Sequence, residues 1–233
     1  MATPDSALRR LMRTTGKLLE PYAFDGEEPT WTRVEPEGVA AIGRTRTFRT
    51  YTGGQQVLSF GLTLSATPAP WWEFCTWRAA RLGAEPTPLS AATGPGLLTD
   101  SALPDSLTEM WSMRILPGHP GHVDQGDIEL IRTELPRRVH AYARRALRLL
   151  EPGHYLEELL NLPDQHAETW EAIVVLLAEQ GPSAHLHEAG EQLVHACTAR
   201  GDADYARAVA EYARTRAADR DAVLAGASSA HEA

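Results

Sequence analysis

VAAIGRTRTFRTYTGGQQVLSFGLTLS, residues 39–65, is the most regular stretch of the chain, and it is divided by the pair Gly53-Gly54. Glycine adopts positive φ at little cost, which is what both central positions of the tightest hairpin turns require. The segment therefore predicts two long antiparallel strands, residues 39–51 and 55–65, joined by a two-residue loop. We expect this hairpin to be the framework of the fold.

The second strand of the hairpin has one strongly apolar face. Its large apolar side chains recur at every second position, at Leu58, Phe60, Leu62 and Leu64. Successive side chains of a strand point to opposite faces, and burial of each large apolar one contributes about 1.5–3 kcal/mol. These four side chains are therefore predicted to face the core.

The two-residue loop also fixes which arginines of the first strand are exposed. Its register gives three pairs: Thr52 with Gln55, Arg46 with Gly61, and Arg44 with Thr63. Arg44 and Arg46 then lie on the polar face, and Arg49 lies beside the leucines. A loop one residue longer would exchange the two faces of the first strand. The assignment of the arginines therefore depends on the turn.

Apolar periodicity predicts the remaining elements. Further strands are expected at residues 30–34 and 109–116, and helices at residues 6–20, 71–81, 128–149, 155–160, 166–179, 184–199 and 202–215. Pro136 is expected to kink the long helix or to begin a second one. The proline- and glycine-rich residues 83–104 predict a long loop.

These elements predict an α+β protein. We expect an antiparallel sheet of about four strands backed by helices, followed by an α-helical C-terminal region. The expected division is an α+β domain over residues 1–150, a helical region over 151–217 and a disordered tail over 218–233.

Composition limits the classes of function. The net charge of −9 argues against a nucleic-acid binder, which normally carries a basic excess or a concentrated basic face. The chain shows no secretory leader and no apolar run of membrane-spanning length. Its two cysteines are far apart in the sequence. We therefore expect a cytoplasmic protein, and its abundance of alanine and arginine with one lysine suggests a GC-rich bacterial genome.

Two groups of residues are candidates for binding. Arginine side chains bind carboxylates and phosphates through paired hydrogen bonds, which makes Arg44, Arg46 and Arg49 candidates for contact with an acidic partner. The same charges would also protect an exposed strand from unwanted association. The second group comprises Trp71, Trp72 and Trp77, which could form an aromatic ligand cage or cover one face of the sheet.

A metal site is a weaker hypothesis. His119, His122 and Asp124 form an HxxHxD sequence in a proline- and glycine-rich loop, and histidine with carboxylate can bind a divalent metal. The favoured alternative is an exposed turn whose aspartate caps the next helix. No cofactor is predicted, because the sequence has no P-loop, GxSxG or dinucleotide-binding motif, and no catalytic residue is predicted.

Several segments resemble one protein family. The first helix ends in LLEPYAF, TWTR follows, and the hairpin ends in QVLSFGLTL; EMWSMRIL and the ELP of residues 134–136 come later. Over about residues 6–150 this order resembles the bacterial DUF4304 family. The resemblance implies a compact domain with an antiparallel sheet backed by helices, and it assigns no catalytic residue. Ala23 stands where the family pattern usually has glycine, and the proline-rich insertion at 83–104 also departs from the pattern.

The resulting hypothesis is a non-enzymatic, cytoplasmic protein-interaction module, of immunity or accessory type, that binds a protein partner through its sheet face. The alternative is a small-molecule enzyme or ligand-binding protein whose pocket combines the tryptophans, the arginines and His119 and His122.

Overall fold

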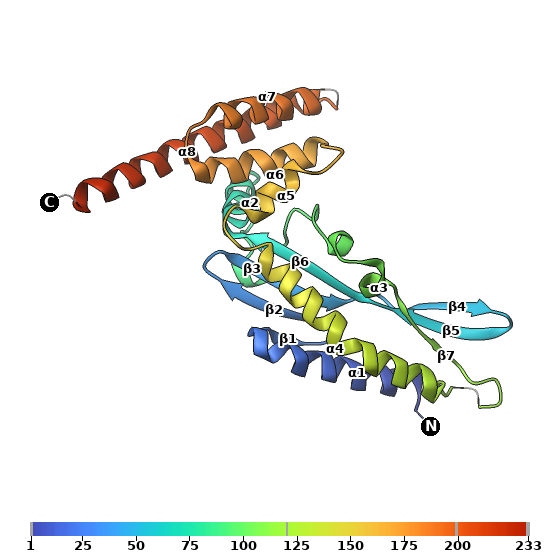
Figure 1. Cartoon of the computed structure of the whole chain (residues 1–233). Helices are drawn as coiled ribbons and strands as arrows, with labels where there is room; N and C mark the ends of the chain where they lie inside the picture. Colours follow the sequence, from blue (N-terminus) through green and yellow to red (C-terminus); the bar gives the residue numbers. More distant parts are fainter. Residues whose placement is uncertain (1, 120, 199, 232–233) are drawn as a thin grey trace. The chain divides into compact units, whose positions relative to one another are not determined.

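The hairpin forms, but it is divided between two antiparallel sheets (Figure 1). The computed structural model describes residues 2–119, 121–198 and 200–231. The four-stranded sheet has the order β1-β2-β3-β6, with β1 Asp25–Glu27, β2 Thr30–Glu35, β3 Gly38–Arg44 and β6 Leu62–Pro68. The three-stranded sheet has the order β4-β5-β7, with β4 Phe48–Thr52, β5 Gln55–Phe60 and β7 Trp111–Arg114.

The division occurs where Gly61 meets Thr45. The Thr45 N–H donates to the Gly61 carbonyl at 3.0 Å, and the Gly61 N–H donates to Thr45 Oγ1 at 2.8 Å. The predicted pair of Thr52 with Gln55 is confirmed. The predicted pair of Arg46 with Gly61 is wrong, because the threonine hydroxyl replaces a backbone acceptor and displaces the pairing by one residue.

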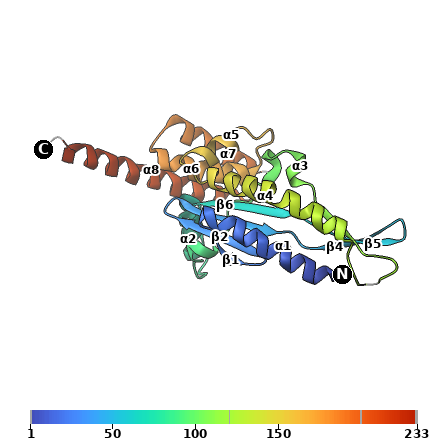
Figure 2. The same ribbon diagram turned by 60° about the horizontal axis from the view of Figure 1, so that its bottom comes forward.

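The predicted apolar face is confirmed. Leu58, Phe60, Leu62 and Leu64 are all buried, on both sides of the division at Gly61. They belong to a core that also includes apolar side chains of α1 (Pro4–Leu19) and α4 (Gln125–Arg148). α4 contacts α1, β3 and β7, and Figures 1 and 2 show α1 and α4 running side by side. The short helix α3 (Asp105–Thr108) also contacts α4.

Pro136 lies inside one continuous helix, so the expected start of a second helix at this residue is wrong. A proline in a helix interior costs about 3 kcal/mol or more. Here Leu135, directly before the proline, and Val139, three residues after it, are fully buried. Burial of such side chains contributes about 1.5–3 kcal/mol each, which offsets the cost of the proline.

Ala23 is predicted to be a site where glycine stabilises the protein. Its φ of 57° and ψ of 29° are left-handed, a conformation that costs a residue with a Cβ about 1–2 kcal/mol. Ala23→Gly is expected to raise the free energy of unfolding by about 0.5–1 kcal/mol, after allowing for the freedom of glycine in the unfolded chain. Urea denaturation measures this change. Ala41→Gly in β3 is the matched control and should lower the free energy of unfolding, so a loss in both variants would contradict the assignment.

The chain divides into two compact units, residues 1–66 with 99–150 and residues 67–98 with 151–233. The first contains most of the two sheets with α1, α3 and α4. The second is helical, with α2 Ala69–Arg81, α5 His154–Leu160, α6 Ala167–Leu177, α7 Ala184–Thr198 and α8 Ala203–His231. The chain passes from the first unit to the second after residue 150, and residues 67–98 pack with the later helices.

α6 forms the centre of the second unit. All its residues from Ala172 to Leu177 are buried, and it contacts α2, α5, α7 and α8. In place of the expected disordered tail from residue 218, α8 continues to His231, since alanine and arginine favour helix. Residues 232–233 lie outside the described part of the chain.

Candidate functional site

The outer strand of the three-stranded sheet, β4, is exposed along its whole length. Figures 1 and 2 show the β4–β5 hairpin extending to one end of the first unit. β4 lies at the edge of its sheet and pairs with β5 alone. Two of its aromatic side chains are solvent-exposed, Phe48 with 50% and Tyr51 with 76% of its surface.

The backbone of β4 offers free hydrogen-bonding groups. Thr52 pairs with Gln55 across the Gly53-Gly54 turn, and alternate residues back along the strand bond β5 in the same way. The N–H and C=O groups of Arg49 and Tyr51 therefore point away from β5. Among the described residues, no backbone bond joins either of them to another element. β4 thus presents an unpaired strand edge.

The three candidate arginines have different environments. Arg44 is held inside its own unit: its guanidinium donates to Glu28 at 2.9 Å, to the Thr45 carbonyl at 2.8 Å and to Thr47 Oγ1 at 2.9 Å. Arg46 and Arg49 are exposed, and neither forms an ion pair with any residue that the structure describes. Arg49 lies opposite Leu58 in the ladder, as predicted. Two of the three arginines therefore remain available.

The tryptophans belong to the second unit and pack its helices. Trp71 is buried against Phe74 at a ring-centroid distance of 5.3 Å. Trp77 lies 5.6 Å from Phe74 and 4.8 Å from Tyr212 of α8. These rings fill the contact between α2 and α8.

Trp72 has a separate role, because its indole N–H donates to the Thr87 carbonyl at 2.7 Å and holds the loop after α2. The three tryptophans therefore form no cage, although Trp77 borders an open hollow of about 700 Å³ with Arg81 and Arg216.

A paired charge network joins α2, α6 and α8. Arg78 bonds Glu171 at 3.0 Å, and Tyr205 donates to the same carboxylate at 2.8 Å. Burial raises the pKa of Glu171 above its usual range, against the lowering effect of these two partners. Burial also raises the pKa of the nearby Cys75 thiol, which leaves little thiolate at neutral pH. The network is suited to holding the helices together and poorly suited to nucleophilic chemistry.

The HxxHxD residues are not assembled as a metal site. The rings of His119 and His122 are 6.5 Å apart. Asp124 accepts a hydrogen bond from the Gly126 N–H at 2.8 Å as the cap of α4. In the described part of the chain, no group of three histidine, cysteine or acidic side chains is placed to hold a metal. Asp124 thus has the capping role that the favoured alternative gave it.

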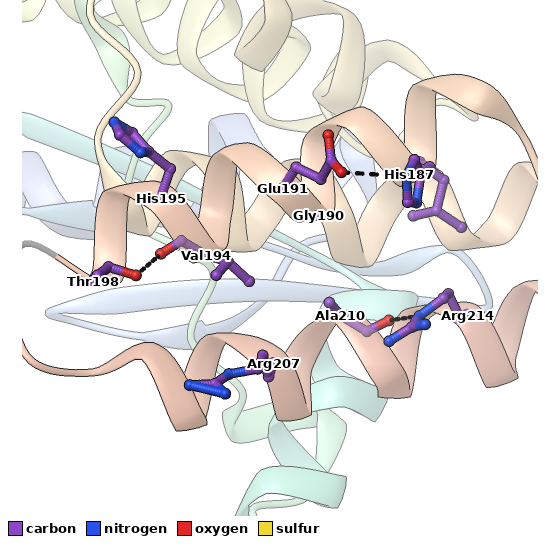
Figure 3. Close-up of a pocket in the computed structure, with 10 residues that line it drawn as sticks. His187, Gly190, Glu191, Val194, His195, Thr198, Arg207, Ala210 and Arg214 are labelled. Carbon is purple, nitrogen blue, oxygen red and sulfur yellow. Dashed lines mark hydrogen bonds and ion pairs between the residues drawn. The ribbon is translucent and has the colours of Figure 1, made fainter.

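A further groove, which was not predicted from the sequence, lies between α7 and α8 (Figure 3). It has a volume of about 480 Å³ and is lined by His187 and His195 on one side and by Arg207 and Arg214 on the other. The spacing of eight residues, which places both histidines on one helix face, was the signal available. Each arginine is paired within its own helix, Arg207 with Asp204 at 3.0 Å and Arg214 with Glu211 at 2.7 Å. The groove is therefore a weaker candidate than β4.

No helix in residues 2–119, 121–198 or 200–231 has both the length and the apolar character needed to cross a membrane. Comparisons of the chain with protein-family models, with curated proteins and with solved structures give no significant match. The resemblance to the DUF4304 family therefore stays a prediction.

Proposed function

We propose that the chain is a cytoplasmic protein-interaction module whose edge strand β4 binds an extended, acidic segment of another protein. The observation that carries the proposal is the combination, on one five-residue strand, of a free backbone edge with exposed Phe48 and Tyr51. Addition of a strand at such an edge gives affinity through main-chain hydrogen bonds and specificity through alternate side chains.

The charges indicate the kind of segment. Arg46 and Arg49 have no ion pair with the described residues, although the chain as a whole carries a charge of −9. An acidic residue opposite Arg49 and an apolar residue two positions away, opposite Tyr51, would match this face of β4. Such complementarity steers association and fixes register.

Protection of the edge against aggregation is the competing interpretation of the arginines. Protective edges carry charges, prolines or bulges. The large exposed surface of Tyr51 does not serve that purpose, because an exposed aromatic side chain favours association. A binding module with no chemistry of its own fits an immunity-type or accessory protein, which is the class that we infer.

The experiment is selection of binders from a display library of random linear peptides, followed by affinity measurement with soluble peptides. We expect selected peptides to alternate acidic and aromatic or aliphatic residues. Arg49→Pro removes an outward N–H and leaves the bonds to β5 in place, so it should abolish binding. Arg49→Glu should weaken binding by at least about tenfold, and Arg132→Ala, an exposed arginine on α4, should leave it unchanged.

Several outcomes would contradict the proposal. Selected peptides that are basic, or whose binding survives Arg49→Pro, would show that β4 is not the binding edge. A dimer that forms in sedimentation experiments and is lost in Arg49→Pro would assign the edge to a second copy of the chain in place of another protein.

A further inference from the structure

A groove of about 440 Å³ in the first unit lies between α1 and the strands β1 and β2. It is separate from β4. Its size falls within the range of pockets that bind small molecules, about 300–1,000 Å³. Its floor, its helix wall and its strand wall differ in chemistry.

The floor of the groove contains an unused hydrogen-bond donor. Trp31 of β2 is 4% exposed, and its indole N–H has no hydrogen-bond partner among the described residues. The indole nitrogen is not among the fully buried polar atoms that lack a partner, so its N–H is accessible from the groove. A ligand atom in the groove can accept a hydrogen bond from this N–H in place of water.

Gly16 controls access to this donor. A Cβ built on Gly16 would lie 3.0 Å from Trp31 Nε1, so any larger residue would cover the indole nitrogen. Glycine inside a helix costs about 0.8–1 kcal/mol relative to alanine, and Gly16 lies inside α1. That cost is consistent with the close approach of α1 to the indole, which a Cβ at this position would obstruct.

The helix wall of the groove is mainly cationic, with Glu20 as the acidic residue at its C-terminal end. Arg9, Arg13 and Lys17 follow one another at intervals of four residues and therefore share one face of α1. All three are exposed, and none forms an ion pair within the part of the chain that the structure describes. The neighbouring Arg10 does not line the groove.

The strand wall of the groove is anionic. It carries Asp25, Glu27 and Glu28 of β1 and the turn that follows it. Glu28 is bound to Arg44 at 2.9 Å, whereas Asp25 and Glu27 form no ion pair with any residue that the structure describes. Opposite charges thus face the same space without joining each other in an ion pair.

We propose that this groove binds a small zwitterion of the amino-acid or dipeptide class. The carboxylate of the ligand lies against Arg9 and Arg13 and accepts a hydrogen bond from the Trp31 indole. Its ammonium group lies against Asp25 and Glu27. A simple anion or a simple cation would satisfy one wall only, which is why a ligand with both charges fits best.

The test uses the full chain labelled with ¹⁵N and follows the indole resonance of Trp31, which is assigned by its absence in Trp31→Phe. The probes are glycylglycine as the zwitterion, inorganic phosphate as the anion and ethylenediamine as the cation. We expect glycylglycine to shift the Trp31 resonance at millimolar concentration, with an affinity at least about tenfold higher than that of either other probe.

Four variants make the test specific. Gly16→Ala should abolish the shift while the helix remains folded, because alanine raises helix propensity. Arg13→Ala and Glu27→Gln should each weaken binding by at least about tenfold, and Arg10→Ala should leave it unchanged. The proposal would be overturned if none of the three probes shifted the Trp31 resonance. Equal binding of phosphate and glycylglycine, with no effect of Glu27→Gln, would overturn the assignment to a zwitterion.

Discussion

Phe60→Ala is expected to lower the free energy of unfolding of the first unit by about 3–5 kcal/mol. Phe60 is 0% exposed and ends β5 next to Gly61, where the hairpin passes from one sheet to the other. Its ring lies 5.5 Å from that of Trp111, its ladder partner on β7. Alanine would leave a cavity in contact with both residues, and neighbouring strands close such cavities only in part.

Urea denaturation followed by hydrogen exchange measures this effect. Peptides from the first unit should lose protection against exchange, and peptides from α6 to α8 serve as the internal reference. Phe48→Ala is the matched control. It is the same substitution one strand away at a half-exposed site, and it should cost less than about 1 kcal/mol. Equal losses in the two variants would mean that the faces of the hairpin are assigned wrongly.

Asp127→Ala is expected to lower the free energy of unfolding by about 2–3 kcal/mol at neutral pH. The carboxylate of Asp127 lies in the first turn of α4 and is buried. It accepts hydrogen bonds from the Arg114 backbone N–H at 2.7 Å and from the Arg114 side chain at 3.0 Å and 2.6 Å. Alanine would leave the β7 amide without its acceptor and would detach α4 from β7.

The effect of Asp127→Ala is also expected to depend on pH. Burial by itself would raise the pKa of Asp127, but the hydrogen bonds and the charge of Arg114 hold this pKa below its usual value. The folded protein therefore favours the ionised form more strongly than the unfolded chain does. The stabilisation is complete above the usual aspartate pKa of about 3.9 and is lost as the pH falls through the lower pKa of the folded state.

Denaturation curves at neutral pH and at successively lower pH measure this dependence, and the difference between wild type and Asp127→Ala should narrow under acid. Glu129→Ala is the control, because Glu129 lies on the same helix but is exposed; it should change the free energy of unfolding by less than about 0.5 kcal/mol. A difference that stays constant down to pH values below the aspartate pKa would contradict the role of the ionised carboxylate.

The candidate surface could be predicted in part from the sequence. Gly53-Gly54 and the alternation after it were enough to place Thr52 opposite Gln55 and to bury the leucine face. Arg46 was predicted on the polar face and is exposed, and Arg49, which was predicted beside the leucines, is exposed as well. The internal role of Arg44 was not predictable, because Glu28 is sixteen residues away and only the folded sheet brings it within 2.9 Å.

The groove between α1 and the strands β1 and β2 could not be predicted from the periodicity of the sequence, although one residue in it is unusual. Gly16 stands inside a strong helical pattern, and the sequence offers no reason for it. Its significance lies in the 3.0 Å between its missing side chain and the indole of Trp31, a residue of β2. A distance between a helix and a strand depends on how they pack, and spacing along the chain cannot supply it.

The sequence by itself determined the class of most of the long elements, the two-residue turn and the apolar faces, since these follow from backbone preferences and from side-chain periods of 2 and 3.6. The tertiary structure decided where the hairpin divides, that Pro136 stays within one helix and that residues 67–98 pack with the C-terminal helices. These outcomes depend on contacts between residues distant in sequence, whose combined burial and hydrogen bonding outweigh local preference.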